Sequence, residues 1–282
     1  MSSAQSFVPS DPEGTIWDVV VIGTGMGGGT AGYELARAGH RVLFIEKGPL
    51  SHHAMRSGIE VPRSPESGSV EDEAAARLRS GSWPHRATVY SNLGKLNFYL
   101  PVGCGSGGTS TFYAAGLERF WPSDFSPRAS FPDVPDSSLP ERWPISYQEL
   151  APFYSRAEAL YRVRGSQDGL HSGSASELQE PPALSVRDQH FEESFRSLGL
   201  HPYRLHVGCE FVKGCEGCPH GPCARGCKSD AGWICLMPAL DRYGAMILPE
   251  CEVLRIDAGT DTVRHLECRG STGLLRIRAR CF

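Results

Sequence analysis

The sequence predicts an α/β protein that starts with a parallel β-sheet, carries an inserted helical region and returns to β-structure near its end. The parallel sheet is indicated by two apolar runs, at 18–22 and 41–46, separated by a glycine-rich turn and one helix length of chain. Alternating apolar and polar residues then predict three short antiparallel strands that form a meander, at 252–257, 262–268 and 274–281.

Composition supports an ordinary globular chain and excludes several classes of protein. The 282 residues carry a formal net charge of −4, and 40% of them are hydrophobic. The length suggests about two domains, or one large α/β domain with an insertion. Basic residues form no stripe, so no nucleic-acid partner is expected. The first residues lack the pattern of a secretory leader, and no apolar run reaches the roughly 18 residues of a membrane span. We therefore expect no transmembrane segment and a cytoplasmic location.

The first part of the chain is predicted to form a β-α-β unit, with a helix over 30–38 between the two apolar runs. From 62 to 82 the residues are polar and small, which predicts a loop around a short helix. We place His52 and His53 in this solvated stretch. A strand-like segment at 97–101 then leads into a second glycine run.

Two helices are predicted in the middle of the chain. Ser146 and Glu149 have the spacing of a capping box, and an aromatic stripe that includes Phe153 follows them at helical spacing, which favours core packing. A second amphipathic helix is expected over 185–198. The last residues, 276–282, look like a strand that stops without a turn or polar tail, so we expect the chain to be incomplete at its C-terminus.

The first glycine run has the spacing of a dinucleotide-binding fingerprint. Gly23, Gly25 and Gly28 fit G-x-G-x-x-G between a predicted strand and a predicted helix, and Glu46 ends the second strand 18 residues after Gly28. Gly23 would permit the tight turn, Gly25 a close approach of a diphosphate, and Gly28 packing of helix on strand. Glu46 would accept hydrogen bonds from the adenosine ribose, which disfavours NADP but leaves NAD and FAD open.

Several further motifs resemble the glucose-methanol-choline (GMC) family of FAD-dependent oxidoreductases. They are IEKG at 45–48, GCGSGGTS at 103–110, ERFWPSDF at 118–125, WPISYQELAPFYSRAE at 143–158 and GCKSDAGWICLMPAL at 226–240. The resemblance implies a Rossmann-like FAD-binding domain and hydride transfer from a CH–OH group to flavin N5, with an alcohol or a sugar-like molecule as substrate.

The resemblance also implies which segments and residues have which role. Residues 15–125 would form the first part of the FAD-binding domain, 126–235 an inserted substrate or cap region, and 236–282 the return to the FAD-binding domain. The expected cofactor-binding residues are Gly23, Gly25, Met26, Gly27, Gly28, Glu46, Lys47, Gly103, Gly105, Gly107, Gly108 and Thr109.

Two departures from the family pattern bear on activity. Tyr113 stands where many members carry an asparagine after the second glycine run. The family's catalytic histidine and its partner lie near the C-terminus of chains about twice as long, and no residue of 1–282 matches them. The catalytic residues are therefore unknown, the histidines present are expected at the surface or in hydrogen bonds, and we expect the chain alone to be inactive.

Six of the ten cysteines lie between 209 and 235. Close thiolates can converge on a soft metal or a cluster. The spacing of Cys218, Cys223 and Cys227 resembles the cluster segment of some sugar dehydrogenases in the family, so an iron–sulfur cluster is one interpretation. A structural zinc site that adds Cys215 is a second, and thiols without a metal are the third.

A cluster would favour a dehydrogenase that passes electrons to an acceptor protein. Two other functions remain open from the sequence. One is a non-catalytic, metal-stabilised dinucleotide-binding fragment, and the other is an NAD-dependent dehydrogenase.

Overall fold

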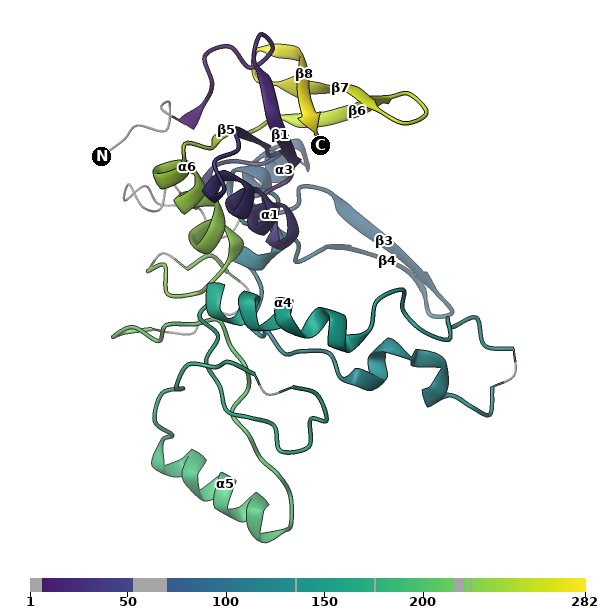
Figure 1. The fold of residues 1–282 in the computed structure, drawn as a ribbon, viewed down its shortest axis with the longest axis vertical. Coiled ribbons are helices and arrows are strands. Elements are labelled where there is room, and N and C mark those ends of the chain that lie inside the picture. Colours follow the sequence, from purple (N-terminus) through teal and green to yellow (C-terminus); the bar gives the residue numbers. More distant parts are fainter. Residues whose placement is uncertain (1–6, 53–69, 135, 175, 216–220, 224) are drawn as a thin grey trace. The chain divides into compact units, whose positions relative to one another are not determined.

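The computed structural model describes residues 7–52, 70–134, 136–174, 176–215, 221–223 and 225–282 (Figure 1). The chain divides into two compact units. The sheet unit contains residues 1–114 and 218–282, and the inserted unit contains residues 115–217.

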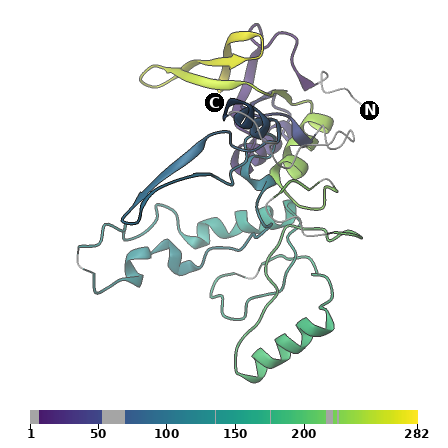
Figure 2. The same ribbon diagram turned by 180° about the vertical axis from the view of Figure 1, so that it is seen from behind.

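The sheet unit is built on one six-stranded sheet with the order β5-β2-β1-β8-β7-β6. Strands β5, β2, β1 and β8 are parallel neighbours, whereas β8, β7 and β6 are joined antiparallel. The predicted meander is thus confirmed, and both ribbon views show it beside β1 (Figures 1 and 2). The strands span β1 Ile16–Ile22, β2 Val42–Ile45, β5 Met246–Leu248, β6 Glu252–Ala258, β7 Val263–Gly270 and β8 Gly273–Cys281.

The parallel part of the sheet is buried on both faces, which explains why its strands are continuous apolar runs. Val42 and Phe44 of β2 pack with the helices on one face. Leu43 and Ile45 pack on the other face with Leu266 of the meander. The helices that pack on the first of these faces are α1 Met26–Arg37 and α6 Met237–Tyr243. A π-helical turn over Gly232–Leu236 precedes α6.

Helix α1 confirms the β-α-β unit but begins at Met26, earlier than the expected start at residue 30. Gly25 is its N-cap, so the last glycines of the first run lie inside its first turn. These glycines do not end the helix because packing requires small residues there. A Cβ on Gly28 would lie 2.2 Å from the Gly23 carbonyl oxygen.

A short helix, α3 Val70–Arg79, follows β2, as the polar stretch predicts. The sequence did not predict the antiparallel hairpin of β3 Arg86–Ser91 and β4 Gly94–Tyr99. Only the segment at 97–101 had been identified as strand-like. The hairpin has no clear apolar alternation because most of its side chains are exposed on both faces.

The inserted unit contains α4 Tyr147–Leu160 and α5 Val186–Ser197, preceded by short 3-10 turns at Pro122–Phe125 and Pro127–Ser130. The predicted capping box of α4 is confirmed, because Glu149 N–H donates to Ser146 Oγ at 3.2 Å and Ser146 N–H to the Glu149 carboxylate at 2.8 Å.

The aromatic stripe of α4 packs only in part. Tyr161, at its end, is buried, but Phe153 is 56% exposed, so the assignment of Phe153 to the core was wrong. The apolar side chains of α5 are exposed as well, and Phe191 stacks on Phe195. Among the described residues, no helix is both long and apolar enough to span a membrane.

Candidate functional site: two glycine runs and a buried polar network

The first glycine run forms the turn between β1 and α1. Gly23 has a φ of +86°, a conformation that favours glycine. Around Gly23, Gly25 and Gly27, a Cβ would have no described atom within 4 Å, so open space lies over the turn. Helix α1 has no side-chain cap and no acidic residue in its first turn, which leaves its N–H groups available to an anion. Met26, its first residue, is half-buried.

Glu46 follows β2 and is held by the same turn. Its carboxylate accepts the Thr24 N–H at 3.0 Å and the Thr24 hydroxyl at 2.6 Å, and it accepts the Gly48 N–H at 3.0 Å. A carboxylate offers about four acceptor positions, so one remains for a further hydroxyl group. Lys47 points its ammonium group at Glu252 of β6, at 2.8 Å, and this pairing lowers the pKa of Glu252.

The second glycine run folds tightly on itself and packs against the first. A Cβ on Gly103 would lie 2.2 Å from the Gly108 carbonyl oxygen, and one on Gly108 would lie 2.9 Å from the Gly25 Cα. Gly107 and Gly108 both have positive φ, at +82° and +55°. Thr109 accepts the Gly103 N–H at 3.3 Å. The structure thus brings the two runs together, although they lie about 80 residues apart in the sequence.

A buried polar network lies beside the second run, and sequence reasoning missed it. His52 Nδ1 is 2.8 Å from Ser106 Oγ, and His52 Nε2 is 2.7 Å from Asp230 Oδ1. The His52 backbone N–H also donates to Ser106 Oγ at 3.1 Å. These bonds are satisfied together when Ser106 donates its proton to Nδ1 and Nε2 donates to Asp230.

The placement of His52 in a solvated stretch was wrong, because its side chain is fully buried and packs edge-on against Trp233. His53 lies outside the described residues. The order serine–histidine–aspartate resembles a hydrolytic triad, but a nucleophile must reach its substrate. Ser106 is only 3% exposed, so the network instead joins three chain segments. No sequence pattern around His52 signals this contact.

Residues 228–233 make further contacts with the end of the second glycine run. The Lys228 ammonium donates to the Thr111 carbonyl at 2.7 Å, and the Ala231 N–H donates to Ser110 Oγ at 3.0 Å. Tyr113, the residue that departs from the family pattern, donates its hydroxyl to the Ser229 carbonyl at 2.7 Å. Because these groups are buried, they fix the path of the glycine run.

The cysteine cluster is described only in part. Cys223 and Cys227 are buried with their sulfurs 3.3 Å apart. Burial opposes ionisation of Cys223, but hydrogen bonds from the Lys228 backbone and from Cys227 outweigh it and lower its pKa. Cys218 lies outside the described residues, so neither predicted metal-ligand set is tested.

The thiol of Cys104, within the second glycine run, differs from that of Cys223 in the direction of its pKa shift. Burial raises the pKa of this thiol to about 11, which keeps it protonated at neutral pH.

Comparisons with known proteins give independent information about the fold and the cofactor. Residues 18–92 match a family model described as an FAD binding domain. Among solved structures, pyridoxine 4-oxidase from Mesorbium loti superimposes with a TM-score of 0.54 at 23% identity, over 93% of this chain and 48% of that one. At 23% identity, the similarity to pyridoxine 4-oxidase shows the fold alone.

Curated relatives extend the match along nearly the whole chain. Paromamine 6'-oxidase from Streptomyces fradiae is 30% identical over 280 residues, which cover 95% of this chain and 47% of that protein. The large subunit of fructose dehydrogenase from Gluconobacter japonicus is 25% identical over 266 residues, which cover 85% of this chain and 46% of that protein. The comparisons give no support for an iron–sulfur cluster. The chain is therefore a homologue of GMC-type FAD-dependent oxidoreductases and spans about half the length of the curated relatives it matches.

Proposed function

We propose that the sheet unit binds FAD across its two glycine runs, and that the protein oxidises the CH–OH group of an alcohol or a sugar-like donor. The observation that carries the proposal is the open space over Gly23, Gly25 and Gly27 beside Glu46. The match to an FAD binding domain over the same residues supports it and disfavours the NAD-dependent alternative.

Several of the predicted cofactor contacts have a physical role in this proposal. The N–H groups at the start of α1 would face the diphosphate, because Gly25 adds no side chain in front of them. Glu46 would use its remaining acceptor position for the adenosine ribose. Gly103, Gly105, Gly107, Gly108 and Thr109 would line the path toward the flavin ring, which accepts a hydride when bound.

Gly25→Ala tests FAD binding most directly. The new methyl group meets no described atom, so the melting temperature without FAD should be unchanged. If the diphosphate lies against the Gly25 backbone, FAD affinity measured by flavin fluorescence should fall at least about tenfold, or ~1.4 kcal/mol. Gly116→Ala, which also has open space, is the matched control. Equal FAD affinity in both variants, or no FAD binding by the unmodified chain, would contradict the proposal.

The catalytic base stays unassigned. An alcohol or a neutral sugar can be added to FAD-loaded protein without oxygen. Bleaching of the flavin absorption would exclude the non-catalytic fragment, because only an active enzyme reduces the flavin. The predicted segment roles for 15–125, 126–235 and 236–282 belong to the same proposal, as do the cytoplasmic location and the electron-acceptor protein.

A metal at the cysteine cluster also remains a proposal. Its support is the short distance between the Cys223 and Cys227 sulfurs. Iron and zinc analysis of protein purified without oxygen distinguishes the iron–sulfur cluster, the zinc site and thiols without a metal. Loss of the metal in Cys223→Ser would assign the site to these residues.

A further inference from the structure

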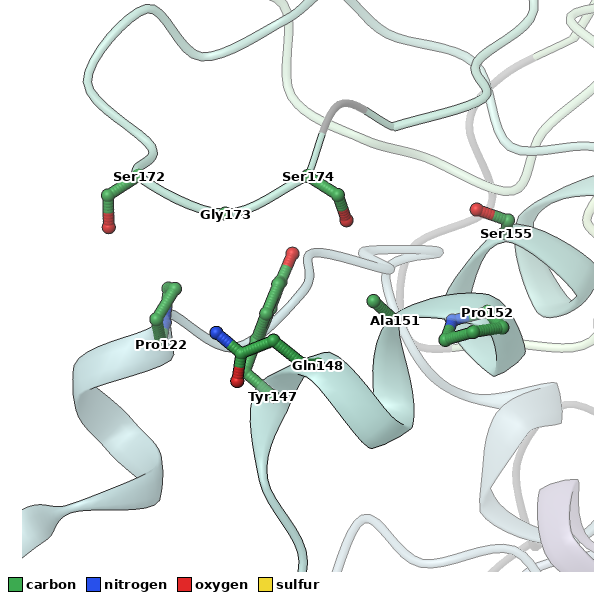
Figure 3. Close-up of a pocket in the computed structure, with 9 residues that line it drawn as sticks. All are labelled: Pro122, Tyr147, Gln148, Ala151, Pro152, Ser155, Ser172, Gly173 and Ser174. Atoms are coloured by element: carbon green, nitrogen blue, oxygen red, sulfur yellow. The ribbon is translucent and has the colours of Figure 1, made fainter.

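The inserted unit contains a pocket of about 450 Å³ between α4 and the loop at 172–174 (Figure 3). This volume is in the range of small-molecule sites. All its lining residues lie between 122 and 174, so the pocket belongs to one compact unit. A ligand bound here would not depend on FAD in the sheet unit.

The lining is mainly apolar, contains several polar groups and carries no formal charge. The hydroxyl groups of Tyr147, Ser155, Ser172 and Ser174 and the amide of Gln148 are the polar groups along it. Figure 3 shows Ser172 and Ser174 on the loop facing α4, and the Tyr147 ring rising from α4 toward that loop. Ala151 and Pro152 supply an apolar surface on the same helix. Such a lining favours a neutral ligand rich in oxygen over an ion.

A buried ion pair beside the pocket determines which way two hydroxyls point. The Arg119 guanidinium forms a bidentate ion pair with the Glu158 carboxylate, through two hydrogen bonds of 2.6 Å each. Arg119 also donates to Ser174 Oγ at 2.9 Å and to Ser155 Oγ at 3.2 Å. A guanidinium only donates, so each serine accepts here and keeps its own proton for another acceptor. Both hydroxyls can therefore donate to a ligand.

The Tyr147 hydroxyl is the second observation that points to a ligand. Tyr147 is 3% exposed, and its hydroxyl has no hydrogen-bond partner among the described residues. The N–H groups of Arg119 all donate to Glu158, Ser155 and Ser174, so none is left to donate to the phenol oxygen. Leaving a buried hydroxyl unpaired is unfavourable, and a ligand oxygen in the pocket would correct it.

We propose that this pocket binds a neutral polyhydroxylated ring of the pyranose type. The ring hydroxyls would accept from Ser155 and Ser174 and pair with Tyr147, while a C–H face of the ring would lie on Ala151 and Pro152. A hydrocarbon would leave the oriented hydroxyls unpaired, and the uncharged lining offers no counterion to an anion or a cation.

Tyr147→Phe in the complete 282-residue chain tests the ligand role of the hydroxyl. With methyl β-D-glucopyranoside as the probe in saturation-transfer NMR, we expect affinity to fall about 2- to 10-fold. The melting temperature without sugar should be unchanged or higher, because the variant removes an unpaired buried hydroxyl. A purely structural hydroxyl would instead lower the melting temperature. Tyr90→Phe, at a 75% exposed tyrosine, is the control.

Gly173→Ala tests the pocket by filling it. A Cβ there would lie 2.3 Å from the Tyr147 hydroxyl, so the loop and the phenol can no longer keep this arrangement, and sugar binding should be lost. Gly169→Ala, in the same segment but with open space around it, should bind like the unmodified chain. The proposal is wrong if the unmodified chain shows no saturable binding of the glucoside, or if both pocket variants bind it unchanged.

Discussion

Two buried polar clusters, one in each compact unit, differ in how fully their charges are paired. In the inserted unit, Arg119 and Glu158 meet in two short hydrogen bonds. In the sheet unit, one carboxylate oxygen of Asp230 bonds to His52, whereas Oδ2 is buried without a partner among the described residues. The charges of the Arg119–Glu158 pair are therefore matched within the cluster. The His52–Asp230 cluster instead retains an unsatisfied acceptor oxygen next to the proposed cofactor site. Variants at the two clusters should therefore lower the free energy of unfolding by different amounts.

The largest loss of stability is expected from removing one partner of the Arg119–Glu158 pair. Glu158→Ala leaves the Arg119 guanidinium buried without its counterion, which should lower the free energy of unfolding by about 3–5 kcal/mol. Urea denaturation followed by circular dichroism measures this loss. Glu193→Ala, at a side chain that is 76% exposed, should leave stability nearly unchanged. A loss below about 1 kcal/mol for Glu158→Ala would mean that the pair behaves like a surface ion pair.

An intermediate effect is expected in the sheet unit. Ser106→Ala removes the hydroxyl that bonds the His52 backbone and ring, and should cost about 1–3 kcal/mol because buried groups lose their partner. The same denaturation experiment gives the value, with the exposed Ser10→Ala as the control. If the loss matches that of Glu158→Ala, the difference between the two clusters does not hold.

A smaller loss of stability is expected from variants at the exposed N-caps of the helices in the inserted unit. Ser146→Ala removes the side-chain cap of α4 and should cost about 1 kcal/mol. Ser185→Ala removes the cap of α5, which lacks buried residues, and serves as the comparison. Chemical denaturation of the two variants should show that only the first changes the stability of the packed part of the inserted unit.

The smallest effect concerns pH and the exposed pair Asp257–Arg264 at the β6–β7 turn. The hydrogen bond from Arg264 lowers the pKa of Asp257 from 3.8 to about 2. A carboxyl group whose pKa is lower in the folded state stabilises the fold above its unfolded pKa. This contribution should therefore disappear as the pH falls from 3.8 toward 2. Asp257→Asn should flatten that part of a melting-temperature profile, whereas Asp261→Asn in the same turn should not.

The sequence predicts best what is encoded by neighbouring residues. The β-α-β unit, the meander and the capping box of Ser146 all depend on short-range periodicity or spacing, and all are confirmed. His52 was misplaced because its partners, Ser106 and Asp230, come from segments far away in the sequence. The pocket at Tyr147 was also missed, because Tyr147 lies outside the predicted aromatic stripe and helical spacing does not show which hydroxyl is left unpaired.

The position of β8 in the sheet has a consequence for how the chain folds. The parallel core includes the pairing of Ile16 of β1 with Arg278 of β8, which lie 278 − 16 = 262 residues apart in the sequence. Contacts of such high sequence separation slow folding, because a long loop must close before its contacts stabilise the chain. During synthesis, the edge of β1 would stay without this partner until β8 has left the ribosome. Until then this edge is open to pairing with other chains.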